Sequence, residues 1–412
     1  MSQPAILGQS VATKNESPTS TSSTSGSVLH ASTDYVTNPF VMRYGRRYLR
    51  DPSLPYPLPV DLPELHRQSL RTLMLTQVFG KPFCSPLLEE RPPKKILEIA
   101  CGSALWSSVC HDYLVRCGVP NASFTGLDIA PLAPNLNERG MNWRFVQHDL
   151  RKSPLPFPDE EFDLVFVKDT GFWAATVGLK VDPLSEPLRL LKPGGALEVW
   201  DSDYTIRTLL PHPPIAFSAA DEDQEQAELT ATYTTAPGTP FTIAKNSYLQ
   251  DYNLWVEKAL DKRKLTAVPC ALVGLVFSGE ADTLRGIGTR RIAIPFGEVR
   301  WEREGIGGRP LEAKKSGRRR LSTSESRVTT KDDGKQLRPH SLNANQAALR
   351  RTALLTVVQM IESMEPMLKD ASGKNQDEWD RWWAGMTTDL LEQKGTASGE
   401  CLEVGAWWGQ KQ

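Results

Sequence analysis

The feature that most constrains the fold is the alternation of short apolar segments with helix-length segments between residues 95 and 200. The apolar segments have the length of buried strands, and stretches at about 105–117 and 183–191 have the spacing of helices. Strands that alternate with helices in this way form a parallel sheet of βαβ units. The expected strands are 95–100, 124–127, 143–146, 162–167 and 196–200.

Elements outside this stretch extend the fold. Pro63 occupies a favoured first-turn position, so Asp61 is expected to cap a helix that ends near Phe79. Further helices are predicted at 248–262, 347–368 and 376–391, and further strands at 289–294 and 401–408. The sequence therefore predicts an α/β, Rossmann-like fold with a mostly parallel seven-stranded sheet, flanking helices and helical additions.

Two segments lack the apolar residues that would offset the entropy of ordering them. The run from Ser17 to Ser25 is almost entirely serine and threonine, and the loop at 302–346 is rich in Arg, Lys, Ser and Gly. The predicted organisation is a disordered tail at 1–38, a cap segment and helix at 39–93, a core at 94–301 with a flexible insertion at about 217–246, a disordered basic loop at 302–346, and C-terminal helices with a last strand at 347–412.

Composition excludes several classes of protein. The chain has 48 Lys and Arg against 49 Asp and Glu, and this balance makes an extended nucleic-acid interface improbable. The six cysteines include no C-x-x-C pair, which favours free thiols over a disulfide frame or a metal site. No apolar run approaches the roughly 20 residues that span a bilayer. We expect a cytoplasmic or nuclear protein, and the basic run at 314–322 is a solvated loop, a nuclear signal or a phosphorylation site.

The loop after the first strand is the strongest functional signal. In a doubly wound sheet, ligands bind outside the carboxyl ends of the strands, where a tight loop must let its backbone approach closely. Small residues stand here at Ala100, Gly102, Ser103 and Ala104, and Asp128 ends the next strand, where a carboxylate can accept both hydroxyls of a ribose. The alternatives are a turn that binds nothing and an aspartate that only caps a helix. A nicotinamide dinucleotide site would need G-x-G-x-x-G, and Gly102 is the only glycine of this loop.

At these residues the chain resembles the class I S-adenosylmethionine-dependent methyltransferases. Their first motif, E/D-x-G-x-G-x-G, corresponds here to Glu98, Ala100, Gly102 and Ala104, with alanine at the first and third glycine positions. The turn at 192–195 is similar to the turn that leads into the family's fifth strand. The resemblance implies that the core binds S-adenosyl-L-methionine as its cofactor.

The resemblance also implies roles for individual residues. Asp128 would bind the cofactor ribose, Asp149 would accept from the adenine amino group, and Glu98 would lie under the loop and stay ionised by accepting backbone N–H bonds. Asp128 and Asp149 could instead cap turns, and Lys168 with Asp169 could be a solvated strand end. The complete implied cofactor set is Glu98, Ala100, Cys101, Gly102, Asp128, Ile129, Asp149, Leu150 and Lys168.

A second, closer resemblance is to the fungal methyltransferases that include the velvet-complex regulator of secondary metabolism. It depends on the stretches 44–48 (YGRRY), 56–61 (YPLPVD) and 198–203 (EVWDSD). In these relatives the N-terminal helix lies over the cofactor site. The resemblance therefore implies that the segment 44–48 lies near the pocket.

Residues after the fourth and fifth strands are candidates for the acceptor end of the site. Trp173, Trp200, Asp201, Asp203 and Tyr204 stand where a methyl acceptor would lie, with ordinary packing as the alternative for the tryptophans. Methyl transfer needs a general base only when the acceptor must lose a proton. By location alone, the candidates for such a base are Asp169, Asp201 and Tyr204.

Two functions are consistent with these patterns. The first is an active methyltransferase whose acceptor is an unidentified small molecule or protein. The second is a regulatory or scaffold protein that keeps the fold and acts through a protein partner. A scaffold has no physical need for Glu98, Asp128 and Asp149 together, so the sequence favours the enzyme. The tryptophans at 379, 382 and 383 are expected to pack in the core, and no metal is expected.

Overall fold

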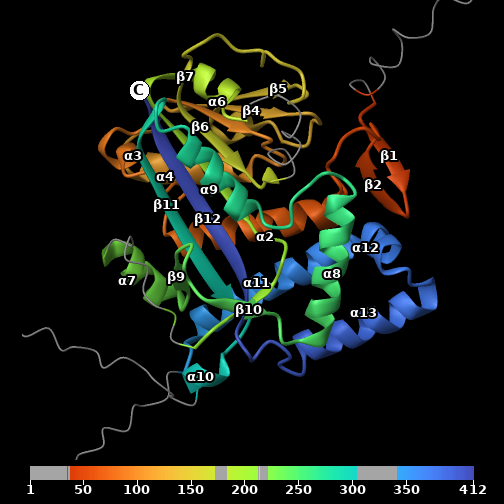
Figure 1. The fold of residues 1–412 in the computed structure, drawn as a ribbon. Coiled ribbons are helices and arrows are strands. Elements are labelled where there is room, and N and C mark those ends of the chain that lie inside the picture. Colours follow the sequence, from red (N-terminus) through yellow and green to blue (C-terminus); the bar gives the residue numbers. More distant parts are fainter. Residues whose placement is uncertain (1–34, 36–37, 172–182, 212, 214–220, 304–340) are drawn as a thin grey trace, which may run out of the picture.

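The structure is a computed structural model that describes residues 35, 38–171, 183–211, 213, 221–303 and 341–412 (Figure 1). Most of the expected tail at 1–38 and of the expected basic loop at 302–346 lies outside the described residues. Within the described residues, no helix is both long and apolar enough to cross a bilayer.

A large central sheet organises the chain, and its first five strands run parallel. In spatial order these strands are β5 (Asn142–Gln147), β4 (Ser123–Asp128), β3 (Lys95–Ile99), β6 (Phe162–Lys168) and β7 (Leu191–Ser202). The long β12 (Glu400–Lys411) pairs antiparallel with β7, and β11 (Leu284–Pro295) pairs antiparallel with β12. This confirms the predicted Rossmann-like, mostly parallel sheet, but among the described residues the sheet has ten strands rather than seven, because three short strands extend it. The order reverses at β3, which has β4 on one side and β6 on the other, so a crevice is expected at the carboxyl end of β3.

Both faces of the parallel strands are buried, as βαβ crossovers require. Alternate side chains of one strand point to opposite faces, so Ile96 joins one apolar cluster and Leu97 the other. On the first face, the ring of Trp106 from α4 (Leu105–Arg116) stacks on Phe166 with ring centroids 3.6 Å apart. The core therefore fixes α4, and with it the loop that joins β3 to α4.

Helices at the carboxyl side of the sheet form a second layer (Figure 1). The predicted first helix is α2 (Leu62–Phe79), which is capped by the Asp61 side chain and packs against α11 (Ala344–Ser363). The expected single helix at 347–368 is two helices, because α11 ends at Ser363 and α12 (Glu365–Ser372) begins with Pro366 in its first turn. Pro lacks the N–H that would continue the helix. Further helices within the described ranges are α3 (Leu87–Glu90), η1 (Leu136–Arg139), α6 (Ser185–Leu190), α7 (Asp221–Thr230), α8 (Ser247–Asp261), α9 (Pro269–Gly279), α10 (Arg300–Arg303) and α13 (Gln376–Leu391).

The tryptophans of α13 pack as the sequence suggests. Trp379 and Trp382 are buried and form an aromatic cluster with Trp255 of α8, with centroid distances of 4.7 to 6.1 Å. Trp383 is partly buried against the same core. The cluster joins α8 to α13 at one end of the molecule (Figure 1).

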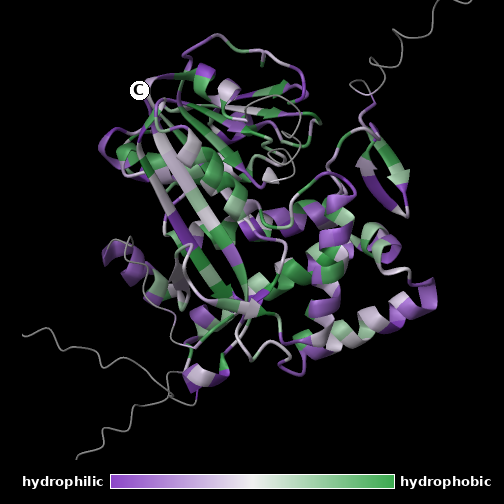
Figure 2. Cartoon of the chain, viewed as in Figure 1, coloured by the Kyte–Doolittle hydropathy of each residue, from purple (hydrophilic) through white to green (hydrophobic). Residues whose placement is uncertain are grey.

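The structure differs from the sequence expectation in the insertion at 217–246. Here lie α7 and the short strands β9 (Tyr233–Thr235) and β10 (Phe241–Ile243), which extend the sheet together with β8 (Arg207–Leu209). Figure 2 shows α7 as hydrophilic along most of its length, so hydropathy gave no sign of a packed element. Polar contacts hold it instead, because the Gln226 amide donates to the carbonyl of Gln77 at 2.8 Å and Asp223 pairs with Arg290 at 3.1 Å.

The N-terminal cap segment folds over the sheet edge. It begins with the hairpin of β1 (Phe40–Arg43) and β2 (Arg46–Leu49). The Arg46 guanidinium forms a bidentate ion pair with Asp61 at 2.6 and 2.8 Å, and Arg47 donates twice to the Val60 carbonyl. These bonds fix the hairpin to the start of α2, so the stretch between them is held as a closed loop.

Candidate active site

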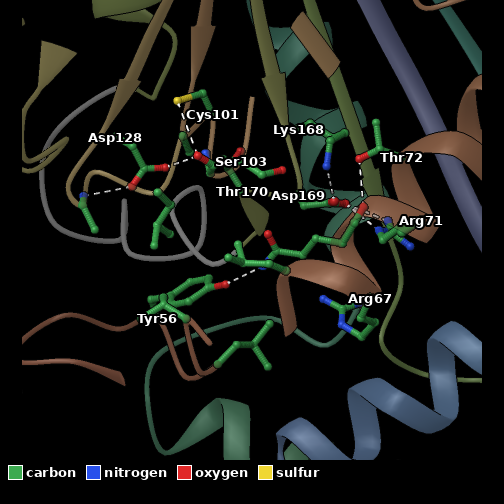
Figure 3. Close-up of a pocket in the computed structure, with 18 of the residues that line it drawn as sticks. Tyr56, Arg67, Arg71, Thr72, Cys101, Ser103, Asp128, Lys168, Asp169 and Thr170 are labelled. Atoms are coloured by element: carbon green, nitrogen blue, oxygen red, sulfur yellow. Dashed lines mark hydrogen bonds and ion pairs between the residues drawn. The ribbon is translucent and has the colours of Figure 1, made fainter. Parts of the chain in front are cut away.

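A cavity of about 210 Å³ lies at the carboxyl ends of β3, β4, β5 and β6 (Figure 3). By the same measure one water molecule needs roughly 10–15 Å³, so the cavity is large enough for an organic ligand. Its walls come from the strand ends, the cap segment, α2, α11 and β12. All nine residues of the predicted cofactor set line it: Glu98, Ala100, Cys101, Gly102, Asp128, Ile129, Asp149, Leu150 and Lys168.

The loop between β3 and α4 takes the left-handed backbone conformation three times. The φ angles are 55° at Ala100, 51° at Gly102 and 55° at Ala104. A side chain at positive φ is disfavoured by roughly 1–2 kcal/mol, which explains why the resembling motif has glycine at these positions. A Cβ added to Gly102 would lie 3.5 Å from the Gln68 Oε1 atom, so α2 passes directly over the loop.

Asp128 ends β4 beside this loop. Its Oδ2 accepts from the Gly102 N–H at 2.8 Å, and its Oδ1 accepts from the Ala130 N–H at 3.1 Å. Burial raises the pKa of Asp128, and these backbone N–H groups oppose the rise. Each oxygen keeps a second lone pair, so the carboxylate can still accept hydrogen bonds from a ligand in the cavity.

Glu98 lies beneath the loop as the resemblance implies, but its protonation differs from the expectation. Its Oε2 accepts from both the backbone N–H and the hydroxyl of Ser107 in α4, at 3.2 and 2.6 Å. Burial raises the pKa of Glu98 to about 7, because these bonds do not offset the loss of solvent. Glu98 is therefore only partly ionised near neutral pH, whereas the resemblance implied an ionised carboxylate.

Asp149 faces the cavity but is already bonded to Arg151. The Arg151 side chain donates to both oxygens of Asp149 at 2.7 to 3.1 Å, and reaches Asp51 at 2.6 Å and Ser53 at 2.8 Å in the cap segment. Burial alone would raise the pKa of Asp149, but Arg151 holds it below the usual value. Arg151 thus fastens the cap segment to the strand end, a contact that sequence reasoning missed although Arg151 stands two residues from Asp149.

Lys168 and Asp169 are not a solvated strand end. Asp169 accepts from Lys168 Nζ at 2.7 Å and from two nitrogens of Arg71 in α2, at 2.9 and 2.7 Å. Arg71 also donates to the Ser202 hydroxyl at 2.8 Å. Burial alone would raise the pKa of Asp169, but the two cations hold it well below its usual range. No local pattern could have paired Arg71 with a residue 98 positions away.

The remaining candidates for a general base differ in their access to the cavity. Tyr204 lines it, and burial raises the pKa of Tyr204 well above its ordinary value. Asp201 is not among the lining residues, its Oδ2 is buried without a hydrogen-bond partner, and burial together with the Asp169 charge raises its pKa to about 7. The Asp203 Oδ1 atom accepts from the Cys270 N–H at 2.9 Å. These positions leave Asp169 and Tyr204 as the candidates that a ligand can reach.

Of the two tryptophans proposed for the acceptor end of the site, only Trp200 lies in the part of the chain that the structure describes. Trp200 is fully buried, its Nε1 donates to Glu198 at 2.7 Å, and its ring contacts Phe79 and Phe166, which is ordinary packing. Trp173 lies outside the described residues. Among the described residues, no group of three or more His, Cys, Asp or Glu side chains is placed to hold a metal ion.

The cap segment reaches the cavity, but with later residues than expected. Leu49, Leu54 and Tyr56 are lining residues, whereas Tyr44 and Tyr48 line a separate, smaller cavity against α12. The Tyr56 hydroxyl accepts from Gln68 at 3.1 Å, which joins the cap segment to α2 above the loop. The stretch 44–48 therefore does not line the cofactor cavity but borders the neighbouring one, and Leu49, Leu54 and Tyr56 line both cavities.

Comparison with known proteins agrees with this geometry. Residues 96–195 match the family model described as a methyltransferase domain. The chain is also similar to the ubiquinone/menaquinone biosynthesis C-methyltransferase UbiE of Azotobacter vinelandii, with 43% identity over 77 residues, or 18% of this chain and 28% of the relative. The same enzyme of Ectopseudomonas mendocina is 34% identical over 122 residues, or 29% of this chain and 46% of the relative. The chain thus spans less than half the length of these relatives.

Solved structures show weaker likeness. YcgJ of Bacillus subtilis has 14% identity and a TM-score of 0.34, with 84% of this chain and 99% of that chain covered. A phosphoethanolamine N-methyltransferase of Haemonchus contortus, in complex with S-adenosylhomocysteine, has 10% identity and a TM-score of 0.33, with 92% and 72% covered. Both scores are below 0.5, so the assignment depends on the sequence match. Residues 96–195 thus match a methyltransferase domain, and they contain the parallel strands of a Rossmann-like sheet.

Proposed function

We propose that the whole protein is an S-adenosylmethionine-dependent methyltransferase that modifies an unidentified acceptor. The observation that carries this proposal is the convergence of the nine predicted cofactor residues, from the ends of four strands, on one cavity. The domain organisation proposed with it is a methyltransferase core at 94–301, covered by the cap segment at 39–93 and completed by 347–412.

The cavity residues fit the cofactor. An added Cβ at Gly102 would meet only the Gln68 side chain, at 3.5 Å, and Asp128 retains acceptor capacity beside the loop. When bound, S-adenosylmethionine supplies an electrophilic methyl group on a sulfonium, which bonds to a lone pair of the acceptor while the electrons of the broken C–S bond remain on sulfur. Asp128 would hold the ribose, and Asp149 with Leu150 would border the adenine. Asp149 shares its oxygens with Arg151, so its contact with an amino group uses the remaining lone pairs.

The residues of this chain serve the reaction mainly by positioning and by excluding water. Asp169 is ion-paired with Arg71 and Lys168, and the low pKa of Asp169 makes it a poor proton acceptor near neutral pH. Tyr204 is a hydrogen-bond donor there, because burial keeps the pKa of its phenol high. We therefore propose an acceptor that is nucleophilic without a strong protein base.

A finer assignment is to the fungal velvet-complex type of methyltransferase, in the cytoplasm or nucleus. Two of the three supporting stretches are bonded to each other through the pairs Arg46–Asp61 and Arg47–Val60. The third contains Glu198, whose carboxylate accepts from the backbone N–H groups of Cys84 and Ser85. Each stretch thus has a structural role.

A second candidate function is a scaffold that acts through a regulatory protein partner. It is favoured by Ala100 and Ala104, because their backbones have the left-handed conformation that glycine would adopt without strain. If this strain has removed cofactor binding, the fold alone would be retained.

Calorimetric titration with S-adenosylmethionine and S-adenosylhomocysteine decides between the two. The enzyme proposal predicts micromolar binding by the wild type, and a large loss in Asp128→Ala and Asp149→Ala. Asp370→Ala is the matched control, because Asp370 pairs with Lys262 on the surface. No binding by folded wild-type protein would overturn the enzyme proposal and leave the scaffold.

A further inference from the structure

The cavity continues beyond the cofactor residues into an apolar compartment. Its lining includes Leu58 and Val60 of the cap segment, Val357 and Met360 of α11, and Leu402 of β12. These side chains are at most 7% exposed although they border open volume. Apolar surface that faces a cavity is stabilised when a ligand of similar polarity fills it.

One cation, Arg67 of α2, borders this compartment. Its Nε and Nη2 donate to Glu64 at 2.9 and 2.7 Å, and the side chain is 6% exposed. None of the described residues accepts from its Nη1. The partner Glu64 also accepts from Gln68 at 3.0 Å and from Ser363 at 2.9 Å, so its oxygens are well bonded. A guanidinium nitrogen that lines a cavity and has no acceptor among these side chains is placed to bind an acceptor group of a ligand.

The charged residues that line the cavity balance as a whole, with four cations against four carboxylates, but cations are in excess on the side of α2. Arg67 is balanced by Glu64, whereas Arg71 and Lys168 together face the single carboxylate of Asp169. This group of five side chains carries one net positive charge. An anion that binds next to it gains from the surplus in a site of low dielectric.

Arg67 is directed toward α11 rather than toward the cofactor loop. The bond from Ser363 of α11 to Glu64 ties the Arg67–Glu64 pair to that helix, whereas Gln68 covers Gly102 and Arg71 contacts the strand ends. Figure 3 shows Arg67 apart from Asp128, on the side of the C-terminal helices. An anion on Arg67 therefore lies in the apolar compartment and not over the loop.

The cap segment limits what can enter. Arg46 bonds Asp61 at one end of it, and Arg151 bonds Asp51 within it, so the loop over the cavity is fixed at both points. We propose that the methyl acceptor is a small, largely apolar molecule with one anionic group, and that Arg67 binds this group while α11 and the cap segment enclose the apolar part. This specifies the acceptor of the proposed methyltransferase and rests on that proposal.

The test uses two fluorescent probes of similar shape on the full chain, with and without S-adenosylhomocysteine. The anionic probe is 8-anilinonaphthalene-1-sulfonate, and the neutral probe is N-phenyl-1-naphthylamine. We expect Arg67→Met to lower the affinity for the sulfonate probe about tenfold or more, and the affinity for the neutral probe by less than about twofold. The double variant Glu64→Gln/Arg67→Met removes the charge with its partner, so an unpaired buried carboxylate cannot unfold it, and it should behave in the same way.

Two controls locate the site and separate the sources of the anion. Met360→Trp fills the apolar compartment and should lower the affinity for both probes. Lys262→Met changes an exposed residue and should leave both affinities unchanged. Equal affinity of the sulfonate probe in wild type and both Arg67 variants would overturn the proposal. Loss of S-adenosylhomocysteine binding in those variants with unchanged sulfonate binding would also overturn it, because Arg67 would then hold the cofactor carboxylate. Failure of the wild type to bind S-adenosylhomocysteine would refute the methyltransferase itself, while the probe comparison would still test Arg67.

Discussion

Arg71 joins the helical cap to the sheet, and its removal should be costly. Its side chain donates twice to Asp169 and once to Ser202, is only 6% exposed, and spans from α2 to the ends of β6 and β7. Arg71→Met keeps the apolar stem and removes the guanidinium. The variant therefore leaves the Asp169 carboxylate with Lys168 as its remaining cation.

The size of the effect follows from these contacts. Removal of one partner from a buried ion pair costs about 3–5 kcal/mol. Lys168 still bonds Asp169 at 2.7 Å, and the Asp169 side chain is 25% exposed, so we expect a smaller loss than this range, about 2–3 kcal/mol. Asp169→Asn added to Arg71→Met removes the uncompensated charge. The double variant should therefore be more stable than the sum of the two single losses by about 1 kcal/mol or more.

Urea unfolding at pH 7, followed by circular dichroism, measures this loss. With a slope of roughly 2–3 kcal/mol per M, Arg71→Met should lower the midpoint by about 1 M. Lys262→Met is the matched control, since it breaks an exposed ion pair and should leave the midpoint unchanged. A midpoint for Arg71→Met equal to that of the control, or strict additivity in the double variant, would refute the reasoning.

Three further predictions follow from the site and the core. Arg151→Ala should speed amide hydrogen exchange at 49–60, because Arg151 bonds the cap segment at Asp51, and unchanged exchange would show that the segment is held otherwise. In the wild type, Glu98 keeps its proton up to a pKa of about 7, whereas the unfolded chain releases it near 4.3. Its contribution to stability is therefore complete below about pH 4 and falls by roughly 4 kcal/mol as the pH rises through 7. Glu98→Gln should lack this loss between pH 5 and 8, and parallel pH profiles of the urea midpoint would contradict it. Trp379→Ala should cost about 3–5 kcal/mol because Trp379 is fully buried in the cluster with Trp255, and a loss below about 1 kcal/mol would be inconsistent with that packing.

The parallel half of the sheet was predictable because its strands are buried on both faces. Such strands appear in the sequence as continuous apolar runs. The strand expected at 162–167 is β6, which ends one residue later. The short strands β8, β9 and β10 were not predictable, because each has three residues and is stabilised by pairing with distant strands. These strands are stabilised by tertiary contacts and not by their local sequence.

The residues of the candidate site were also predictable only in part. Asp128 and Asp149 follow strands of a parallel sheet, so topology brings them to one edge together with Gly102. Arg67 and Arg71 were missed because two arginines at helical spacing usually indicate a solvated face, and only the packing of α2 shows that both are buried. The pKa of Glu98 was misjudged because its burial depends on how α4 lies over β3, which the sequence of the strand does not encode.

The most direct test of the central claim is a crystal structure of the full chain with S-adenosylhomocysteine. We predict the ligand in the cavity at the ends of β3 and β4, with its ribose hydroxyls on Asp128 and its amino acid portion over the loop at Gly102. An ordered cavity that stays empty at saturating ligand, or a ligand bound elsewhere on the chain, would contradict the claim that these residues form a cofactor site.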